Sequence, residues 1–279
     1  MQQQGESWMK KHLPNIILTV ILIAGLSLLL YPTVSDYWNS LHQSRAIANY
    51  EEAVAAMDDE TYEEYWNQAL DYNERLWKRS NRYYPSEEEQ AEYQSLLNIS
   101  GNGIMGYIQI PSIDVSLPVY HGVDEAVLQV AVGHIESSSL PVGGEGSHCV
   151  LSGHRGLPSA RLFTDLDQLV EGDVFMLKVL NETLTYQVDQ IRIVLPEEVD
   201  DLDLIRGKDY CTLVTCTPYG INTHRLLIRG FRIDNLAEGV TVRVTPDATL
   251  LDPKLVAPAI AIPMLLVLLL WLLIKYRKK

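Results

Sequence analysis

The sequence predicts a mainly β domain that follows a helical segment and lies between two membrane-spanning helices. Short β-branched runs, each bounded by Gly, Pro, Asn or Asp, fill residues 103–252 and are typical of a sandwich or a closed barrel. Apolar residues repeat every three or four positions within residues 35–102, as they do in amphipathic helices. Two long apolar stretches without charged residues lie near the ends of the chain.

The first apolar stretch becomes long enough to cross a bilayer when residues 13–34 are counted together. Lys10 and Lys11 precede it, within a predicted cytoplasmic segment of residues 1–12. The alternative is a cleaved signal peptide. No small-x-small cleavage site ends the stretch cleanly, since Tyr31-Pro32-Thr33 follows. We therefore expect an uncleaved anchor.

The second apolar stretch is predicted to form a transmembrane helix over residues 253–274, and the basic residues 275–279 follow it. A buried core helix is the alternative, which the terminal position and the basic tail disfavour. Basic flanks favour the cytoplasmic side, so both termini are predicted to lie in the cytoplasm and the domain between them outside the cell. The net charge of −14 is then concentrated outside, and it argues against a nucleic-acid partner.

Residues 36–97 are predicted to form helices with one apolar face. That face includes Tyr62, Tyr65, Trp66, Ala69, Leu70, Asn73, Leu76 and Trp77. The acidic residues between them are interpreted as a solvated face. Ser86 and Glu89 match a capping box, so a further helix is predicted from about Glu87 to about Asn98.

Several runs after Gly103 have the composition of strands, and two short segments between them are predicted to be helical. The strand runs are residues 106–111, 115–120, 148–152, 174–180, 184–188, 191–194, 211–216, 225–231 and 240–244. The helical segments are residues 126–130 and 160–166.

The cysteine content limits the possible chemistry. Three cysteines cannot all pair with one another, so a disulfide scaffold is not indicated. Cys149 and Cys211 lie inside strand runs, where packing is their expected role. The chain has no C-x-x-C or H-x-x-x-H spacing and no glycine-rich phosphate loop, so we expect neither a metal site nor a cofactor.

Cys216 is the best candidate for a nucleophile. It ends a strand run and precedes Thr217-Pro218-Tyr219-Gly220, a turn sequence. Functional side chains concentrate where strands pass into loops, because loops can present them to solvent. The alternative is a small buried cysteine, which is the more frequent fate of an unpaired one.

Two further residues could complete a site with Cys216. His154 follows a strand run in a loop flanked by glycines, and Arg225 begins the strand run after Gly220. Taken singly, His154 could be a loop histidine bonded to backbone and Arg225 a surface arginine. Together with Cys216 they supply a nucleophile, a proton-transfer group and a cation, which are the parts that acyl transfer at a thiol requires.

Long motifs in the right order resemble the sortases, a family of cysteine transpeptidases. The cysteine and arginine signature of that family resembles residues 212–230, which contain Cys216 and Arg225. The histidine region of class C, the pilus-assembling sortases, resembles residues 133–144 and 151–167. Residues 103–111 and 117–122 are similar to the start of the same catalytic core, and the two anchors also suit class C.

The resemblance implies a closed eight-stranded sortase-type β-barrel with short helices. It implies Cys216 as nucleophile, His154 as general acid and base, and Arg225 as stabiliser of the oxyanion or the substrate. The implied substrates are pilins or other surface proteins with LPxTG-type signals, handled at the membrane of a Gram-positive type of cell. In pilus polymerisation, a Lys amine of the next pilin would resolve a thioacyl intermediate on Cys216 and leave an isopeptide bond. By family analogy, the loop between residues 191 and 211 is expected to shape substrate selection.

One departure from the family pattern concerns the lid. Class C sortases usually carry an Asp-Pro-aromatic plug between the N-terminal helices and the barrel. The corresponding segment here contains Tyr83, Tyr84 and Pro85 but no such triplet. We expect either an open site or a weaker cover by these residues. The simpler interpretation, which we favour, is that they only join two helices.

Three other functions fit the same residues. As an enzyme, the protein would anchor single proteins to cell-wall peptidoglycan or only hydrolyse the signal. As a non-catalytic protein, it would be a scaffold for pilus assembly. The presence of Cys216, His154 and Arg225 argues against the scaffold.

Overall fold

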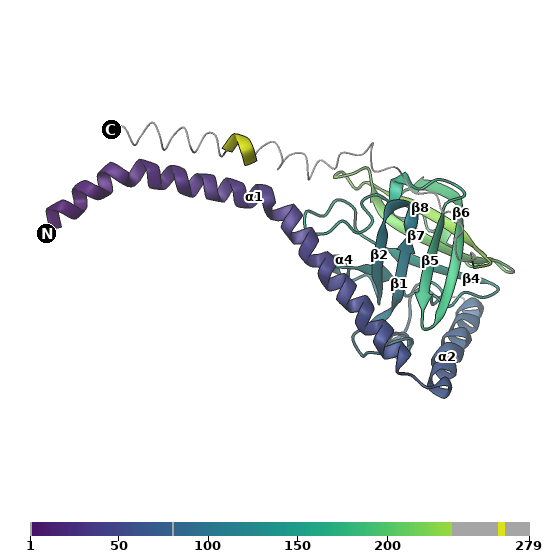
Figure 1. The fold of residues 1–279 in the computed structure, drawn as a ribbon. Coiled ribbons are helices and arrows are strands. Elements are labelled where there is room, and N and C mark those ends of the chain that lie inside the picture. The colour runs from purple at the N-terminus through teal and green to yellow at the C-terminus, as the bar shows by residue number, and fades with distance from the viewer. Residues whose placement is uncertain (1, 80, 236–261, 266–279) are drawn as a thin grey trace. The chain divides into compact units, whose positions relative to one another are not determined.

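A computed structural model describes residues 2–79, 81–235 and 262–265 (Figure 1). The chain divides into two compact units. One unit contains Met1–Tyr37 and Pro246–Lys279, and the other contains Trp38–Thr245. Every strand that the structure describes lies in the second unit.

Helix α1 (Gln2–Ala55) begins in the first unit and ends in the second. Its part from Leu13 onward is long and apolar enough to cross a membrane, judged by length and composition, as the sequence predicted for the first anchor. The predicted second anchor, residues 253–274, lies outside the described residues except for one helical turn at residues 262–265. The strand predicted at residues 240–244 lies outside them as well.

The described strands close into an eight-stranded barrel with the order β1-β2-β3-β4-β7-β8-β6-β5. The strands are β1 (Ile104–Ile110), β2 (Val115–His121), β3 (Val132–His134), β4 (Ser147–Ser152), β5 (Val174–Val179), β6 (Glu182–Val194), β7 (Asp209–Thr217) and β8 (His224–Ile233). The pairs β2–β3 and β4–β7 are parallel, and the other neighbours are antiparallel. This confirms the closed barrel and excludes the sandwich.

Three local features differ from the sequence-based expectation. The runs at residues 184–188 and 191–194 form one strand, β6, which has an irregularity between Val188 and Gln190. Strand β3 was not predicted, because three residues are too few to show an alternating pattern. The helix predicted at residues 160–166 is wrong: Leu162 has a φ of 39°, and only a 3-10 turn at Leu166–Gln168 follows. The other short helix, α4 (Glu125–Leu128), is present where expected.

The end of α1 is joined to the barrel through Tyr50, which is 1% exposed. Its hydroxyl donates to the Met105 carbonyl at 3.0 Å and accepts from the Leu180 N–H at 2.7 Å. Met105 lies in β1 and Leu180 follows β5, and these two strands are neighbours in the barrel. One buried side chain therefore ties the helix to the seam between two strands.

Helices α2 (Asp59–Lys78) and α3 (Glu87–Ser95) pack on the barrel and share its hydrophobic core. The capping box of Ser86 and Glu89 is confirmed. Asn73 of α2 is 8% exposed, and its amide bonds both the N–H and the carbonyl of Leu140. Such a pair satisfies a buried amide and a buried peptide group together, so it fixes the position of α2.

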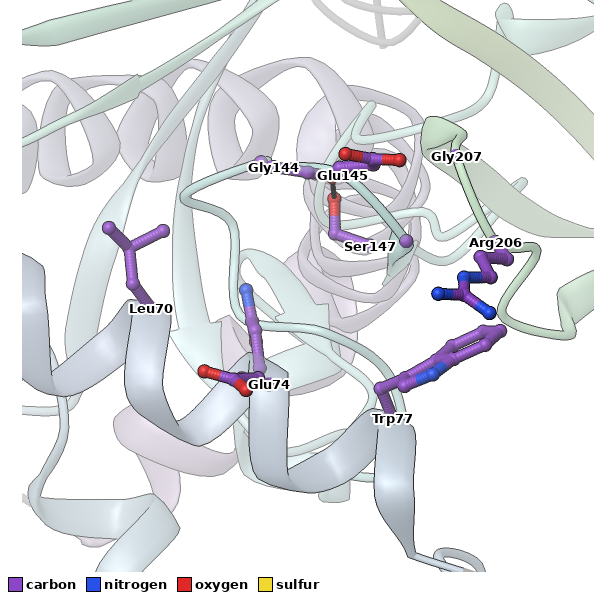
Figure 2. A pocket seen from close by; sticks show the side chains of 11 residues that line it. Leu70, Glu74, Trp77, Gly144, Glu145, Ser147, Arg206 and Gly207 are labelled. Atoms are coloured by element: carbon purple, nitrogen blue, oxygen red, sulfur yellow. Dashed lines mark hydrogen bonds between the residues drawn. The ribbon is translucent and has the colours of Figure 1, made fainter.

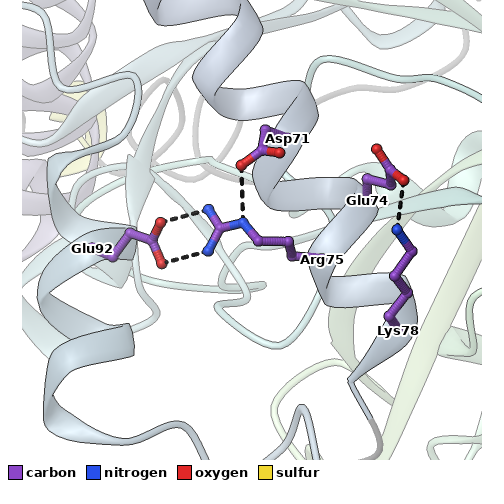
Figure 3. A network of polar contacts seen from close by, with 5 residues as sticks. All are labelled: Asp71, Glu74, Arg75, Lys78 and Glu92. Atoms are coloured by element: carbon purple, nitrogen blue, oxygen red, sulfur yellow. Dashed lines mark hydrogen bonds and ion pairs between the residues drawn. The ribbon is translucent and has the colours of Figure 1, made fainter.

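Arg75 links α2 to α3, as Figure 3 shows. Its guanidinium donates to Glu92 at 2.5 and 3.1 Å and to Asp71 at 3.0 Å. A separate pair, Lys78 and Glu74, lies one turn further along α2. These groups are largely exposed, so each pair contributes at most about 1 kcal/mol to stability. The buried contacts of Tyr50 and Asn73 hold the helices more strongly.

We predict that Tyr50→Phe destabilises the full chain by about 1–3 kcal/mol, because it leaves a buried N–H and a buried carbonyl without partners. Chemical denaturation of the detergent-solubilised protein measures this. Tyr62→Phe is the matched control. The Tyr62 hydroxyl donates to the exposed carboxylate of Glu182 at 3.2 Å, so its loss should cost less than about 1 kcal/mol. Equal effects of the two variants would contradict the assignment.

Candidate active site

Cys216 and Arg225 lie directly opposite each other on antiparallel strands β7 and β8. Side chains at opposite positions project from the same face, with Cβ atoms about 5 Å apart. Both residues are partly exposed, whereas Thr215 and Thr217 beside Cys216 are buried. Because successive side chains alternate along a strand, Cys216 and Arg225 project from the outer face of the barrel.

His154 lies two residues beyond β4, the parallel neighbour of β7 on the side away from β8. The preceding residue, Gly153, makes two hydrogen bonds to β7, one through its N–H and one through its carbonyl. Its N–H donates to the Val214 carbonyl at 3.0 Å, and its carbonyl accepts from the Thr215 hydroxyl at 2.7 Å. The fold therefore brings Cys216, Arg225 and His154 to the same end of three adjacent strands.

Glu125 of α4 is a carboxylate near this site that sequence reasoning missed. Its Oε2 lies 4.0 Å from Nε2 of His154. The two residues are distant in the sequence, and Glu125 lies in no motif. No local signal could have identified it, because only the closure of the barrel brings α4 beside the loop after β4.

A small apolar cluster, which we call the outer cluster, lies on the same outer face as Cys216. It consists of Val150, Val194, Val214 and Leu227, with Ile135 and Leu202 packed against it. The intervening residues of β4, β7 and β8 belong to the main core instead. The outer cluster therefore forms an apolar floor that leads along β7 towards Cys216.

The β6–β7 loop, residues 195–208, contributes Leu202 to this floor and is held by polar contacts at its centre. His148 of β4 is 1% exposed and bonds the Asp203 carbonyl through Nδ1 at 2.9 Å and the Thr212 hydroxyl through Nε2 at 2.7 Å. Arg82, from the segment between α2 and α3, pairs with the Asp203 carboxylate at 2.5 Å. Burial lowers the pKa of His148 to about 4, so the ring of the folded protein is neutral at pH 7.

The lid candidates Tyr83, Tyr84 and Pro85 lie between α2 and α3, and Tyr83 contacts the β6–β7 loop. The Tyr83 hydroxyl is 3.4 Å from the Asp203 carboxylate, and its ring lies 4.7 Å from the Arg82 guanidinium. Tyr84 is 79% exposed, and Pro85 is partly buried. The Tyr83 side chain therefore contacts Arg82 and the β6–β7 loop.

Arg155 connects the loop after β4 with the loop after β7. It pairs with Asp167 and donates to the Thr217 hydroxyl at 3.4 Å. Its guanidinium also lies 5.9 Å from the centroid of the Tyr219 ring. These contacts hold the residue next to His154 against the residues that follow Cys216.

The other cysteines have the packing role that the sequence predicted. Cys149 and Cys211 lie opposite each other on β4 and β7, and both are at most 1% exposed. Burial raises the pKa of the Cys211 thiol well above its ordinary value. Within the described part of the chain, no group of three His, Cys, Asp or Glu side chains could hold a metal ion.

A hollow of about 300 Å³ lies between α2 and the loops that precede β4 and β7 (Figure 2). Leu70, Trp77, Glu145 and Arg206 are among its lining residues. It opens at the start of β4 and β7, whereas His154 and Cys216 lie at the end of these strands. None of its lining residues is a cysteine or a histidine, so the candidate active site is elsewhere.

The comparisons with known proteins all return members of one family. The sortase domain matches residues 108–233. Sortase C1 of Streptococcus agalactiae is 53% identical with a TM-score of 0.67, and the alignment covers 69% of this chain and 100% of that one. Sortase C of Streptococcus pneumoniae, described with its pilin substrate specificity, is 44% identical with a TM-score of 0.62 and coverages of 69% and 98%.

Sortase C of Clostridium perfringens, solved with the C-terminal cell wall sorting motif, is 43% identical with a TM-score of 0.61. Its alignment covers 69% of this chain and 100% of that one. The chain also matches sortase A of Streptococcus agalactiae at 32% identity and sortase A of Staphylococcus aureus at 34%, and it spans 47% and 58% of the length of these two relatives.

We predict that His148 makes stability depend on pH below neutrality. Its pKa falls from 6.5 to about 4 on folding, so the unfolded chain binds the proton first and stability is lost as pH falls from 6.5 towards 4. The loss attributable to His148 reaches about 3 kcal/mol. His148→Gln should remove that part of the decrease in unfolding free energy between pH 7 and pH 4, measured by denaturation at each pH. Parallel curves for the two proteins would contradict the prediction.

Proposed function

The chain belongs to the sortase family and to its class C, and from this premise we propose that it is a membrane-anchored extracellular transpeptidase that joins pilin subunits. The observation that carries the proposal is the placement of Cys216, His154 and Arg225 at one end of three adjacent strands. The apolar helix α1 supports the membrane anchor. Both termini are proposed to be cytoplasmic, as the basic flanks favour.

The proposed first half-reaction is cleavage of the sorting signal. Cys216, as thiolate, attacks the carbonyl carbon of the Thr residue, and the carbonyl oxygen becomes an oxyanion. Arg225 lies opposite Cys216, where its N–H groups can stabilise that charge. His154, as imidazolium, gives its proton to the leaving Gly amine when the C–N bond breaks. The product is a thioester on Cys216 and a neutral His154.

The outer cluster is proposed to receive the apolar part of the signal. Val214 lies two residues before Cys216 on the same face of β7, and Leu227 lies opposite Val214 on β8. Side chains on this floor can bury a Leu-Pro segment next to the carbonyl that Cys216 attacks. The Clostridium perfringens enzyme solved with a sorting motif supports this class of substrate.

The second half-reaction transfers the acyl group to a Lys amine of the next pilin. This acceptor is proposed from class C membership and from the pilin specificity described for the Streptococcus pneumoniae enzyme. His154 takes a proton from the amine, the new C–N bond forms, and the thiolate of Cys216 leaves. The product is an isopeptide bond between two subunits.

The segment with Tyr83, Tyr84 and Pro85 is proposed to brace the β6–β7 loop instead of plugging the site. Arg82 and Tyr83 both contact Asp203, and Asp203 is also held by His148. Leu202, next to Asp203, packs on the outer cluster. The brace would therefore set the position of one wall of the substrate groove.

The decisive experiment mixes the full chain, in detergent or nanodiscs, with a pilin that carries an LPxTG-type signal. We predict a Thr–Lys isopeptide between pilins and a thioester on Cys216, both detected by mass spectrometry. Cys216→Ala should give neither product. Absence of both products with the wild-type chain, alongside an active class C sortase as positive control, would refute the transpeptidase.

We further predict that Thr215→Val lowers the rate of signal cleavage by about tenfold to a hundredfold, because loss of its bond to the Gly153 carbonyl releases the backbone beside His154. Thr185→Val is the control, since this buried Thr of β6 donates to Asn235, which follows β8 at the end away from Arg225. It should cost similar stability and leave the cleavage rate within about twofold. Equal rate losses in both variants would show that Thr215 acts through stability alone.

A further inference from the structure

Glu125 is a charged group beside the active site that the mechanism above does not use. It is the first residue of α4, and its side chain is 75% exposed, whereas that of His154 is 28% exposed. Its Oε2 faces Nε2 of His154 across 4.0 Å. An exposed carboxylate this close to the proton-transfer group can contact any nucleophile that approaches the imidazole from solvent.

The carboxylate is oriented by its own helix. Its Oε1 accepts from the Gln129 side chain one turn later, which leaves Oε2 towards His154. The residues just after α4 are held in turn by α1, because Gln43 donates to the Val130 carbonyl at 2.7 Å. These two contacts fix the place of α4 and orient the Glu125 carboxylate.

The separation of 4.0 Å is too long for a hydrogen bond between the two side chains. It suits a third atom between them, because one nitrogen can lie about 2.8 Å from both Oε2 and Nε2. That nitrogen must donate to both groups, since a carboxylate and a neutral imidazole present acceptors there. An ammonium group has three donors and a charge opposite to that of Glu125.

We propose that Glu125 and His154 form the binding subsite for the ammonium group of the acceptor Lys. This inference rests on the proposed function. The acceptor must arrive charged, because the ordinary pKa of Lys is about 10.4, yet it must attack as a free amine. Glu125 attracts the ammonium and holds it against His154, which is neutral after it has protonated the leaving Gly amine.

The proton and bond changes in the subsite are balanced. The Lys ammonium gives one proton to Nε2 of His154, and its nitrogen then attacks the thioester carbonyl. The C–N bond forms, the C–S bond breaks, and Cys216 leaves as thiolate. The second proton of the new amide nitrogen goes to solvent, so the products are the isopeptide, the thiolate, the imidazolium and one released proton.

The test compares acceptors on the full chain with Glu125→Gln and Glu125→Lys. With a Lys-bearing pilin, we expect transpeptidation to fall about tenfold in the Gln variant and further in the Lys variant, mainly through a higher KM for the acceptor. With hydroxylamine, which is uncharged at neutral pH, release of the thioacyl group should stay within about twofold of wild type. Circular dichroism and the midpoint of chemical denaturation, each compared with wild type, show whether the variants are folded.

Asp124→Asn is the matched control. Asp124 is the neighbouring carboxylate, has no capping hydrogen bond from its side chain, and should have little effect on either acceptor. Equal losses with pilin and hydroxylamine would overturn the subsite and make Glu125 a positioning residue for His154. Unchanged transfer to the pilin would overturn it as well. A wild-type chain that forms the thioester but never transfers it to Lys would instead refute the proposed acceptor.

Discussion

The hydrogen-bonded register of β7 is the constraint on which the site depends. Strand β7 pairs with β4 on one side, as far as Val214, and with β8 on the other, where the pairing includes Cys216. The first pairing brings Gly153, and thus His154, beside Thr215, while the second places Arg225 opposite Cys216. A slip of one residue would turn Cys216 into the barrel, because side chains alternate between faces along a strand. The core residues Cys211 and Leu213 on the inner face oppose such a slip.

The rest of the chain stabilises this arrangement from outside. Tyr50 ties α1 to the β1–β5 seam, and Asn73 ties α2 to the Leu140 backbone. Buried His148 and partly buried Arg82 both hold Asp203, so the loop that contributes Leu202 to the outer cluster is attached to a strand and to the helical segment at once. The helical segment therefore supports the β6–β7 loop and links α1 to the barrel.

Features that depend on local sequence could be predicted. The Ser86 capping box and most strand runs follow from neighbouring residues, and so does the position of Cys216 near the end of a strand and before a turn. Features that depend on closure of the barrel could not be predicted. Glu125 reaches His154 only because α4 and the loop after β4 meet in space, and no spacing in the sequence encodes that contact. At residues 160–166, apolar residues with helical spacing are buried in a loop, where Leu162 has a positive φ.

The central claim is that His154 lies beside Cys216 across the β4–β7 pair, and disulfide trapping tests it most directly. His154→Cys in the full chain should form a disulfide with Cys216 under mild oxidation, because neighbouring strands bring Cα atoms within the reach of a disulfide. Non-reduced peptide mapping by mass spectrometry would identify the linked peptides, with His42→Cys on α1 as the control that should not link. Failure of His154→Cys to link, with Cys216 still open to alkylation, would contradict the account.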